Sequence, residues 1–324
     1  MSQPNGGALA SDARRSKEVA LSSFSSEWLA LSRRPEWRAH GLLLLTAAIW
    51  GMGFVAQRAG MRHLGPFAYN AARFALGAAA LEIVLRSQNR PAPRASRAVS
   101  WHGWALGALL FTAASLQQAG LVFTTAGKAG FITGLYVVWV PLLSALAGRN
   151  VRGAVWWGAG LAVAGLYLLS ATAAWRIEKG DALVLLSAWF WALHVLMVDG
   201  FVEGHDSLRL AARQFWVVAA LSAGAAWLGE NPSWAGLKAA IPAVLYGGLI
   251  SVGIGYTLQV VAQRHAEPGL AAIILSLEAV FALLGGVVLL GERLTLRGGI
   301  GATLMLAGMA LAQRGSAPQT DHAP

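Results

Sequence analysis

The 324-residue chain has no cysteine, and only 12% of its residues are charged. The lack of thiols excludes a disulfide framework, a thiolate metal site and a cysteine nucleophile. An ordinary soluble domain has roughly 25% charged residues, whereas here 56% of the residues are apolar and the mean hydropathy is +0.54. This composition excludes a soluble globular protein and indicates an integral membrane protein.

The few charged residues are mostly basic, which gives a formal net charge of +10. In a soluble chain such a balance would suggest nucleic-acid binding. Here the lysines and arginines are scattered through a polar N-terminal tail and through the gaps between apolar segments. We interpret them as membrane-topology signals and expect no nucleic-acid partner.

Apolar segments of the length needed to cross a bilayer, about 20 residues, fill most of the chain. Ten of them lie at about 39–58, 66–86, 101–122, 129–148, 153–173, 181–200, 207–228, 238–262, 268–290 and 296–313. They predict an all-α integral membrane protein with ten transmembrane helices. Polar tails flank this region at residues 1–38 and 314–324, and we expect the Ser-rich first tail to be disordered. The excess of lysine and arginine on the side of the N-terminus predicts that both tails are cytoplasmic.

Short phrases from the first half of the chain recur in the second half, 140 to 143 residues later and in the same order. They pair Trp50 with Trp191, Ala71-Ala72-Arg73 with Ala211-Ala212-Arg213, Leu116-Gln117 with Leu258-Gln259, and Gly148, Gly158 and Gly165 with Gly291, Gly301 and Gly308. The pattern predicts two five-helix repeats, residues 39–173 and 174–313. Because five is odd, the second repeat must enter the membrane inverted, as in many secondary transporters.

Three phrases give the chain a family resemblance: WGMGF at 50–54, AGKAGFITGLY at 126–136, and SLEAVF at 276–281 followed by LGERL at 290–294. In content and order they resemble the EamA-type, ten-helix branch of the drug/metabolite transporter superfamily. The resemblance covers roughly residues 39–313 and implies a carrier of the inner membrane, most members exporting amino acids and other small metabolites. Members of that family commonly have a proline directly after the glutamate of the third phrase. This chain keeps the carboxylate of Glu278 but has Ala279 in place of the proline.

Glu278 is the most deeply placed acidic residue of the predicted spans. It lies ten residues after Pro268, about 15 Å along a helix and therefore near the middle of the bilayer, where a charge costs about 2.5–3.5 kcal/mol. Two roles fit this position. Glu278 could exchange protons or bind a substrate cation, with protons as the coupling ion, or it could form an interhelical ion pair or hydrogen bond.

Arg73 and Arg213 are the repeat-related cations, each about seven residues inside its predicted span. They could bind a substrate carboxylate at two mirrored gates. Alternatively, each could hydrogen-bond the carbonyls of a neighbouring helix or extend towards the headgroups. Asn70 lies one turn before Arg73 on the same face, and Glu82 lies close to the predicted cytoplasmic end, where a surface role is expected.

Two amides and two indoles complete the candidate substrate pathway. Gln117 and Gln259 are repeat-related and must find partners inside a helix bundle, either substrate or another helix. Trp50 and Trp191 could line an aromatic cavity for apolar or cationic solutes, or pack in the core. His194 has no ligand-type neighbours at helix-face spacing, so we predict no metal site.

The chain has no H-E-x-x-H, no G-x-S-x-G and no G-x-x-x-x-G-K-[ST] phrase, so the sequence gives no support to a protease, a lipase or an ATPase. Polar residues spread over both repeats are typical of a transporter rather than of one catalytic constellation. We predict a secondary transporter that needs no cofactor, exports small metabolites such as amino acids by alternating access, and has the bilayer as its surroundings. The alternative is a membrane-embedded enzyme that acts on a lipid-linked substrate.

Overall fold

A computed structural model describes residues 35–88, 97–124, 126–170, 179–203, 205–290 and 295–314, and these residues are helical or form turns between helices. Six helical segments in this part of the chain are long and apolar enough to cross a membrane. They are Pro35–Gly60, Pro66–Ser87, Lys128–Leu146, Lys179–Val202, Ile241–Ala262 and Pro268–Gly285. The protein is therefore a multi-pass membrane protein, as the composition predicts. Most of the two predicted tails, residues 1–34 and 315–324, lies outside the described residues.

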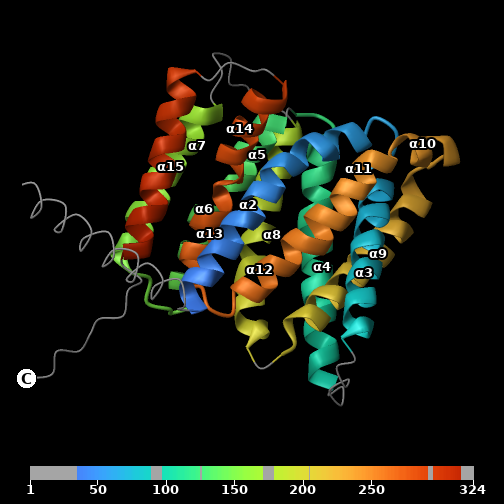
Figure 1. The fold of residues 1–324 in the computed structure, drawn as a ribbon, viewed down its shortest axis with the longest axis horizontal. Helices are drawn as coiled ribbons and strands as arrows, with labels where there is room; N and C mark the ends of the chain where they lie inside the picture. Colours follow the sequence, from blue (N-terminus) through green and yellow to red (C-terminus); the bar gives the residue numbers. More distant parts are fainter. Residues whose placement is uncertain are drawn as a thin grey trace, which may run out of the picture.

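The helices form one bundle (Figure 1). The first half contains α2 (Pro35–Gly60), α3 (Pro66–Ser87), α4 (Arg97–Gly120), α5 (Ala126–Gly134), α6 (Tyr136–Leu146) and α7 (Gly153–Ser170). The second half contains α8 (Lys179–Val202), α9 (Ser207–Gly229), α10 (Trp234–Ala239), α11 (Ile241–Leu245), the π-helix η1 (Tyr246–Tyr256), α12 (Thr257–Ala262), α13 (Pro268–Ser276), α14 (Glu278–Leu290) and α15 (Leu296–Arg314). Each predicted apolar segment is occupied by helix, although α2 begins at Pro35, inside the predicted tail.

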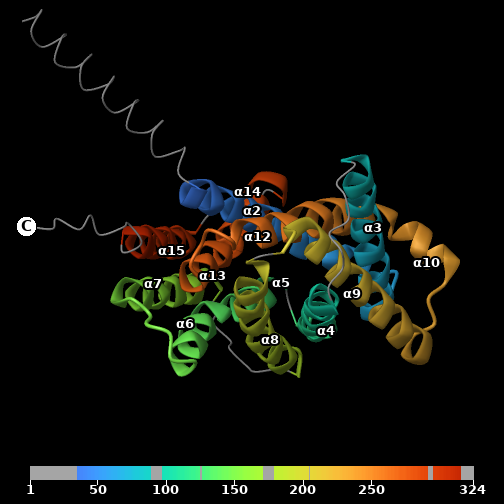
Figure 2. The ribbon, with the colours of Figure 1, turned by 90° about the horizontal axis from the view of Figure 1, so that it is seen from below.

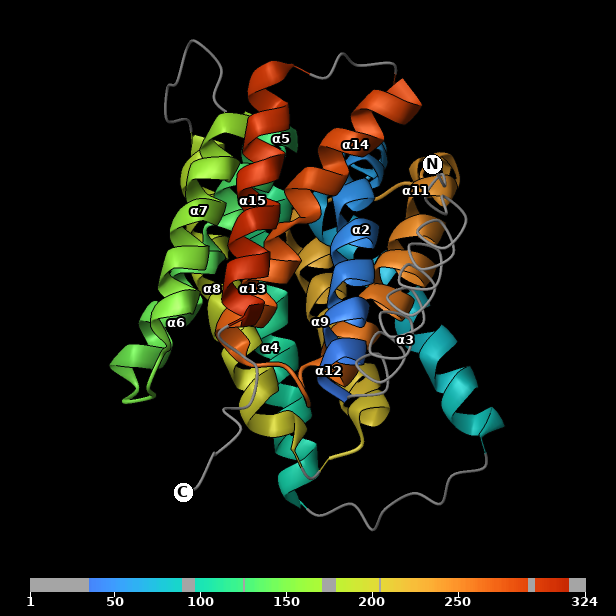
Figure 3. The same ribbon diagram turned by 60° about the vertical axis from the view of Figure 1, so that its left-hand side comes forward.

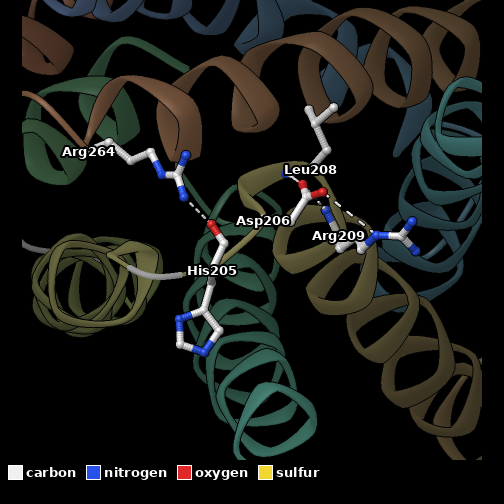
Figure 4. Close-up of polar contacts among 5 residues, drawn as sticks. All are labelled: His205, Asp206, Leu208, Arg209 and Arg264. Carbon is white, nitrogen blue, oxygen red and sulfur yellow. Dashed lines mark hydrogen bonds and ion pairs between the residues drawn. The ribbon is translucent and has the colours of Figure 1, made fainter. Parts of the chain in front are cut away.

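Helix starts follow local sequence signals. Pro66 and Pro268 stand at the first positions of α3 and α13, where a missing N–H costs nothing. Asp206 caps α9, because its carboxylate accepts hydrogen bonds from the N–H groups of Leu208 at 3.0 Å and Arg209 at 3.3 Å (Figure 4). These signals set the loop between α8 and α9.

Helices α3 and α9 carry the two Ala-Ala-Arg phrases and run antiparallel side by side, as Figures 1 and 2 show. Glu230, the residue that ends α9, accepts hydrogen bonds from the backbone N–H groups of Phe67 at 2.9 Å and Ala68 at 2.8 Å, at the start of α3. Since α9 ends where α3 begins, the two helices lie at the same depth along their whole lengths.

Helices α7 and α15 form a second antiparallel pair (Figure 3). Gly158 faces Gly308 and Gly165 faces Gly301, so closely that a Cβ atom on any of the four would lie 2.5–2.7 Å from the carbonyl oxygen of its partner. The contact is reciprocal because the repeat-related residues Gly158 and Gly301 each face the other's repeat-related neighbour. Glycine is required here for backbones to approach so closely.

Ion pairs connect the helix ends on both sides of the bundle. At the first turn of α8, Asp181 accepts from the Nζ of Lys128 at 2.7 Å and from the hydroxyl of Thr124 at 2.6 Å. Near the last turn of α8, Asp199 pairs with Arg149 at 2.5 Å. Arg152 and Glu267 form a further ion pair on the side of Asp199. Figure 4 shows Arg264, on the same side, donating to the carbonyl oxygen of His205.

Candidate functional site

The middle of the bundle encloses a narrow cavity of about 30 Å³ between helices from both halves. That volume holds roughly two water molecules. Its lining residues are Trp50, Phe54, Gln57, Arg73, Gln117, Thr133, Tyr136, Trp191, Val195, Ser251, Tyr256, Gln259, Leu275 and Glu278. Six of the eight residues that the sequence singles out are among them, so the structure brings most of the predicted site together.

Glu278 is the acidic group of this cavity. Its side chain is 4% exposed, and its Oε1 atom has no hydrogen-bond partner among the described residues. Gly51 of α2 lies so close that a Cβ atom there would overlap the carbonyl oxygen of Glu278. The absence of a side chain at Gly51 therefore allows α2 to pack directly against the backbone that carries the carboxylate.

A break in the helix, between α13 and α14 at Leu277, positions Glu278 as the first residue of α14. The hydroxyl of Ser276 donates to the carbonyl of Ile273 at 2.8 Å, and the N–H of Leu277 bonds to Ile274 at 3.1 Å. Such side-chain and three-residue hydrogen bonds compete with the α-helical pattern. The break therefore forms without the proline that the related family has at position 279.

The same break occurs in the first half, between α5 and α6 at Leu135, where the N–H of Leu135 bonds to Ile132 at 3.2 Å. Tyr136, the first residue of α6, lines the cavity and lies 142 residues before Glu278, within the spacing of the repeated phrases. Our sequence analysis missed Tyr136, although that spacing pairs it with Glu278. A helix interrupted at membrane depth exposes backbone ends only where they line a cavity.

Arg73 is the basic group of the cavity and is 3% exposed. Its Nε donates to Oδ1 of Asn70 at 2.9 Å, and its guanidinium carbon lies 4.9 Å from the ring centre of Phe74 and 5.5 Å from that of Tyr69. Asn70 thus orients Arg73 from outside the cavity lining. None of the ion pairs among the described residues includes Arg73. A buried cation without a carboxylate partner favours an anionic ligand.

Three aromatic rings from different helices cluster at the cavity. The ring centres of Trp50 and Tyr256 are 4.5 Å apart, those of Trp191 and Tyr256 are 5.9 Å apart, and those of Trp50 and Trp191 are 6.5 Å apart. Both indole N–H groups are occupied, Trp191 by the side-chain oxygen of Gln117 at 2.8 Å and Trp50 by the carbonyl of Ser251 at 3.3 Å. The rings are therefore fixed in place.

The two predicted amides differ in their surroundings. Gln117 is engaged by Trp191, whereas the Oε1 of Gln259, a residue only 1% exposed, has no hydrogen-bond partner among the described residues. Of the two, Gln259 has the free capacity to contact a substrate. Gln117 acts on the cavity by orienting an indole.

The π-helix η1 brings Ser251 and Tyr256 to the cavity, two residues that sequence reasoning missed. Helix α2 holds η1 in place: Thr46 donates to the carbonyl of Gly255 at 3.3 Å, and the hydroxyl of Tyr246 donates to the carbonyl of Ile49 at 2.7 Å. A π-helix is rare and occurs frequently at functional sites. The run of glycines in η1 was its only local signal in the sequence.

Three other residues of interest lie away from the cavity. Arg213 is exposed at the outer surface of α9, where its aliphatic carbons cover Gly103 of α4, so the structure does not bring it to the site of its repeat partner. Glu82 is paired with Arg86 at 3.2 Å near the end of α3. His194 is buried against Gln214 at 2.9 Å, and the described residues contain no group of three potential metal ligands.

Comparison with known proteins identifies the family. The model of the EamA-like transporter family matches residues 37–171 and again residues 178–313. The chain belongs to the EamA-like transporter family. An "Uncharacterized transporter" of Archaeoglobus fulgidus is 31% identical over 270 residues, which cover 82% of each chain. The "Uncharacterized protein PA1977" of Pseudomonas aeruginosa is 32% identical over 252 residues, 75% of this chain and 82% of that protein.

A solved structure described as "Crystal structure of protein" shares the fold, with a TM-score of 0.72 over 85% of this chain and 95% of that one at 20% identity. As an EamA-like transporter, the protein acts on a small-molecule substrate within a lipid membrane. The family thus matches the resemblance in the phrases around Trp50, Gly130 and Glu278.

Proposed function

We propose that the protein is a secondary transporter that exports a small zwitterionic metabolite of the amino-acid type, by alternating access and without ATP hydrolysis. The observation that carries this proposal is the central cavity, in which a buried guanidinium and a buried carboxyl group lie without pairing to each other. A zwitterion supplies the two charges that such a pair lacks. Membership in a transporter family favours this function over an enzyme acting on a lipid-linked substrate.

In this proposal the substrate carboxylate binds Arg73 and the substrate ammonium group binds Glu278. A guanidinium matches a carboxylate in geometry, and a cation is also attracted to the faces of aromatic rings. Trp50, Trp191 and Tyr256 would therefore pack against the side chain of the substrate. Gln259 has an unsatisfied oxygen that can accept from the ammonium group.

We further propose that residues 39–173 and 174–313 are two inverted repeats with five membrane crossings each. Four observations support this: the family model matches twice, α3 and α9 run antiparallel, the glycine contacts of α7 and α15 are reciprocal, and the helix breaks at Leu135 and Leu277 are 142 residues apart. The topology signals of the loops favour an inner-membrane protein with cytoplasmic termini.

Alternating access requires that the two ends of the cavity open in turn. At about 30 Å³ the cavity is too small for an amino acid, so this conformation corresponds to a closed intermediate. The pair of Lys128 with Asp181 lies at one end of α8 and the pair of Arg149 with Asp199 at the other. Opening either end would break one pair and leave the other intact.

Glu278 would also couple transport to protons. A carboxyl group in an apolar cavity is stabilised by protonation when the substrate ammonium group is absent. Loading of the substrate would release the proton, and return of the empty carrier would take one up from the other side. This exchange would drive export with the proton gradient across the inner membrane.

Counterflow in proteoliposomes tests the substrate class. Vesicles preloaded with a mixture of amino acids are given a radiolabelled zwitterionic amino acid, its amide, which lacks the carboxylate, or its deaminated analogue, which lacks the ammonium group. We expect rapid exchange of the zwitterion and slow exchange of both analogues. Equal exchange of all three compounds, or no exchange above protein-free vesicles for a full amino-acid panel, would overturn the proposal.

A further inference from the structure

A second concave site lies on the outer surface of the bundle, away from the transport cavity. It is a groove of about 660 Å³ between α3, α4 and α9. Two tryptophans border it, Trp104 at 55% exposure and Trp216 at 45%. Two arginines, Arg209 and Arg213, and the carboxylate of Glu82 supply its charges.

The groove opens towards the bilayer at the level of the headgroups. Helix α9 lies alongside α3 over its full length, and α3 is long and apolar enough to cross the membrane. Arg213 lies six residues after Ser207, about 9 Å from the start of α9. Exposed tryptophans at this depth are typical of the boundary between headgroups and acyl chains.

Packing fixes the position of one guanidinium in this groove. The aliphatic carbons of Arg213 lie directly over Gly103 of α4, where a Cβ atom would be 2.6 Å from Cδ and 2.8 Å from Cγ of the arginine. The stem of Arg213 therefore has little room to move, and its guanidinium is held in the groove. The next turn of α9, with Val217 packed in the same way on Gly107, continues the groove as an apolar surface.

The charges around the groove do not balance. Glu82 pairs with Arg86 at 3.2 Å, and Asp206 pairs with Arg209 at 3.7 Å (Figure 4). With Arg213 included, three guanidinium groups face two carboxylates. One excess positive charge at the membrane boundary is complementary to a single phosphodiester.

We propose that this groove binds one anionic phospholipid. Its phosphate lies against Arg213 and Arg209, because guanidinium groups bind phosphate oxygens in pairs. An acyl chain extends over Val217 and Ala220, and Trp104 and Trp216 flank the glycerol region. Basic pockets between membrane helices are known to select anionic headgroups. No residue of the transport cavity takes part, so the inference does not depend on the proposed function.

Native mass spectrometry of the full-length protein in detergent tests the proposal. The probes are phosphatidylglycerol and phosphatidylcholine with identical acyl chains, offered at equal concentration. We expect the wild-type protein to retain one phosphatidylglycerol in preference to phosphatidylcholine. Arg213→Gln should reduce this preference about fivefold, the equivalent of about 1 kcal/mol. Arg314→Gln, which removes an exposed arginine elsewhere, should leave the preference unchanged.

Two additional measurements keep the outcome clear if Arg213→Gln folds poorly. In the wild-type protein, phosphatidylglycerol should raise the unfolding temperature more than phosphatidylcholine does, and inorganic phosphate should not replace it. Arg213→Lys should keep part of the preference, because the charge remains while the paired hydrogen bonds are lost. Equal retention of both lipids by the wild-type protein, or an unchanged preference in Arg213→Gln, would overturn the proposal.

Discussion

At the scale of single residues, the account depends on Glu278 and Arg73, two buried groups whose side chains form no ion pair among the described residues. Burying such groups without a partner reduces stability. A transporter can use that cost, because the empty cavity then favours a ligand that brings the missing charges. The following two predictions separate the roles of the two groups.

Glu278→Gln keeps the size of the side chain and removes its ionisable group. We expect a zwitterionic substrate to bind about tenfold more weakly or worse, because a hydrogen bond to a charged group contributes about 1.5–3 kcal/mol. We also expect exchange to lose its dependence on pH between about 5 and 9, the range over which its proton exchange would act. Both are measured by counterflow at a series of pH values. Glu82→Gln, on an exposed ion pair, is the matched control, and wild-type behaviour of Glu278→Gln would remove Glu278 from the coupling mechanism.

Arg73→Gln should discriminate between substrate classes. Exchange of the zwitterion should fall about tenfold or more, whereas the slow exchange of the amide analogue, which has no carboxylate, should change little. Arg73→Lys should recover part of the loss because the charge remains. Equal losses for the zwitterion and the amide would mean that Arg73 supports the fold and does not select a carboxylate.

At the scale of helices, close packing through glycine explains the pairing of α7 with α15. Gly158→Val would drive a branched side chain into the carbonyl of Gly308. We expect a loss of about 1–3 kcal/mol in stability, seen as a lower unfolding temperature in detergent. Gly160→Val is a matched control two residues away, because nothing lies within 4 Å of a Cβ atom there. Equal unfolding temperatures for the two variants would contradict the packing argument.

The start of α9 offers a second test at this scale. Asp206→Ala removes the acceptor for the N–H groups of Leu208 and Arg209 and should cost about 1 kcal/mol. Asp206→Asn keeps a capping oxygen and should cost less. Thermal unfolding of the two purified variants makes the comparison, and a larger loss for the asparagine variant would contradict the capping role.

The sequence predicts the helices better than their irregularities. Apolar length alone places helix on every predicted segment, because a bilayer demands it. The breaks at Leu135 and Leu277 and the π-helix η1 depend on hydrogen bonds that other helices supply, such as those from Thr46 and Tyr246. No local pattern around Leu277 announces them, since the expected proline is absent.

The same limit applies to the site. Burial cost identifies Glu278 and Arg73 from the sequence, because a charge inside a membrane helix needs a reason. Repeat symmetry also suggested that Arg213 would mirror Arg73, but Gly103 of α4 offers Arg213 a surface on which to lie, and its side chain stays at the outside of the bundle. Equivalent positions in two repeats keep their depth without keeping their neighbours.

At the scale of the whole molecule, the account makes the cavity a shared product of two halves inserted in opposite directions. The repeat-related helices α3 and α9 run antiparallel, which this insertion requires. The loops after the first helix of each half should therefore lie on opposite sides of the membrane. His63 and Glu203, both exposed and 140 residues apart, stand in these two loops.

Labelling of single cysteines tests this arrangement most directly, and the absence of natural cysteine means that no background residue must be removed. His63→Cys and Glu203→Cys would each be treated with a membrane-impermeant maleimide in intact cells and again after permeabilisation. We predict that His63→Cys reacts in cells whose inner membrane is intact and that Glu203→Cys reacts only once that membrane is opened. Labelling of both positions from the same side would contradict the inverted halves and the transport mechanism built on them.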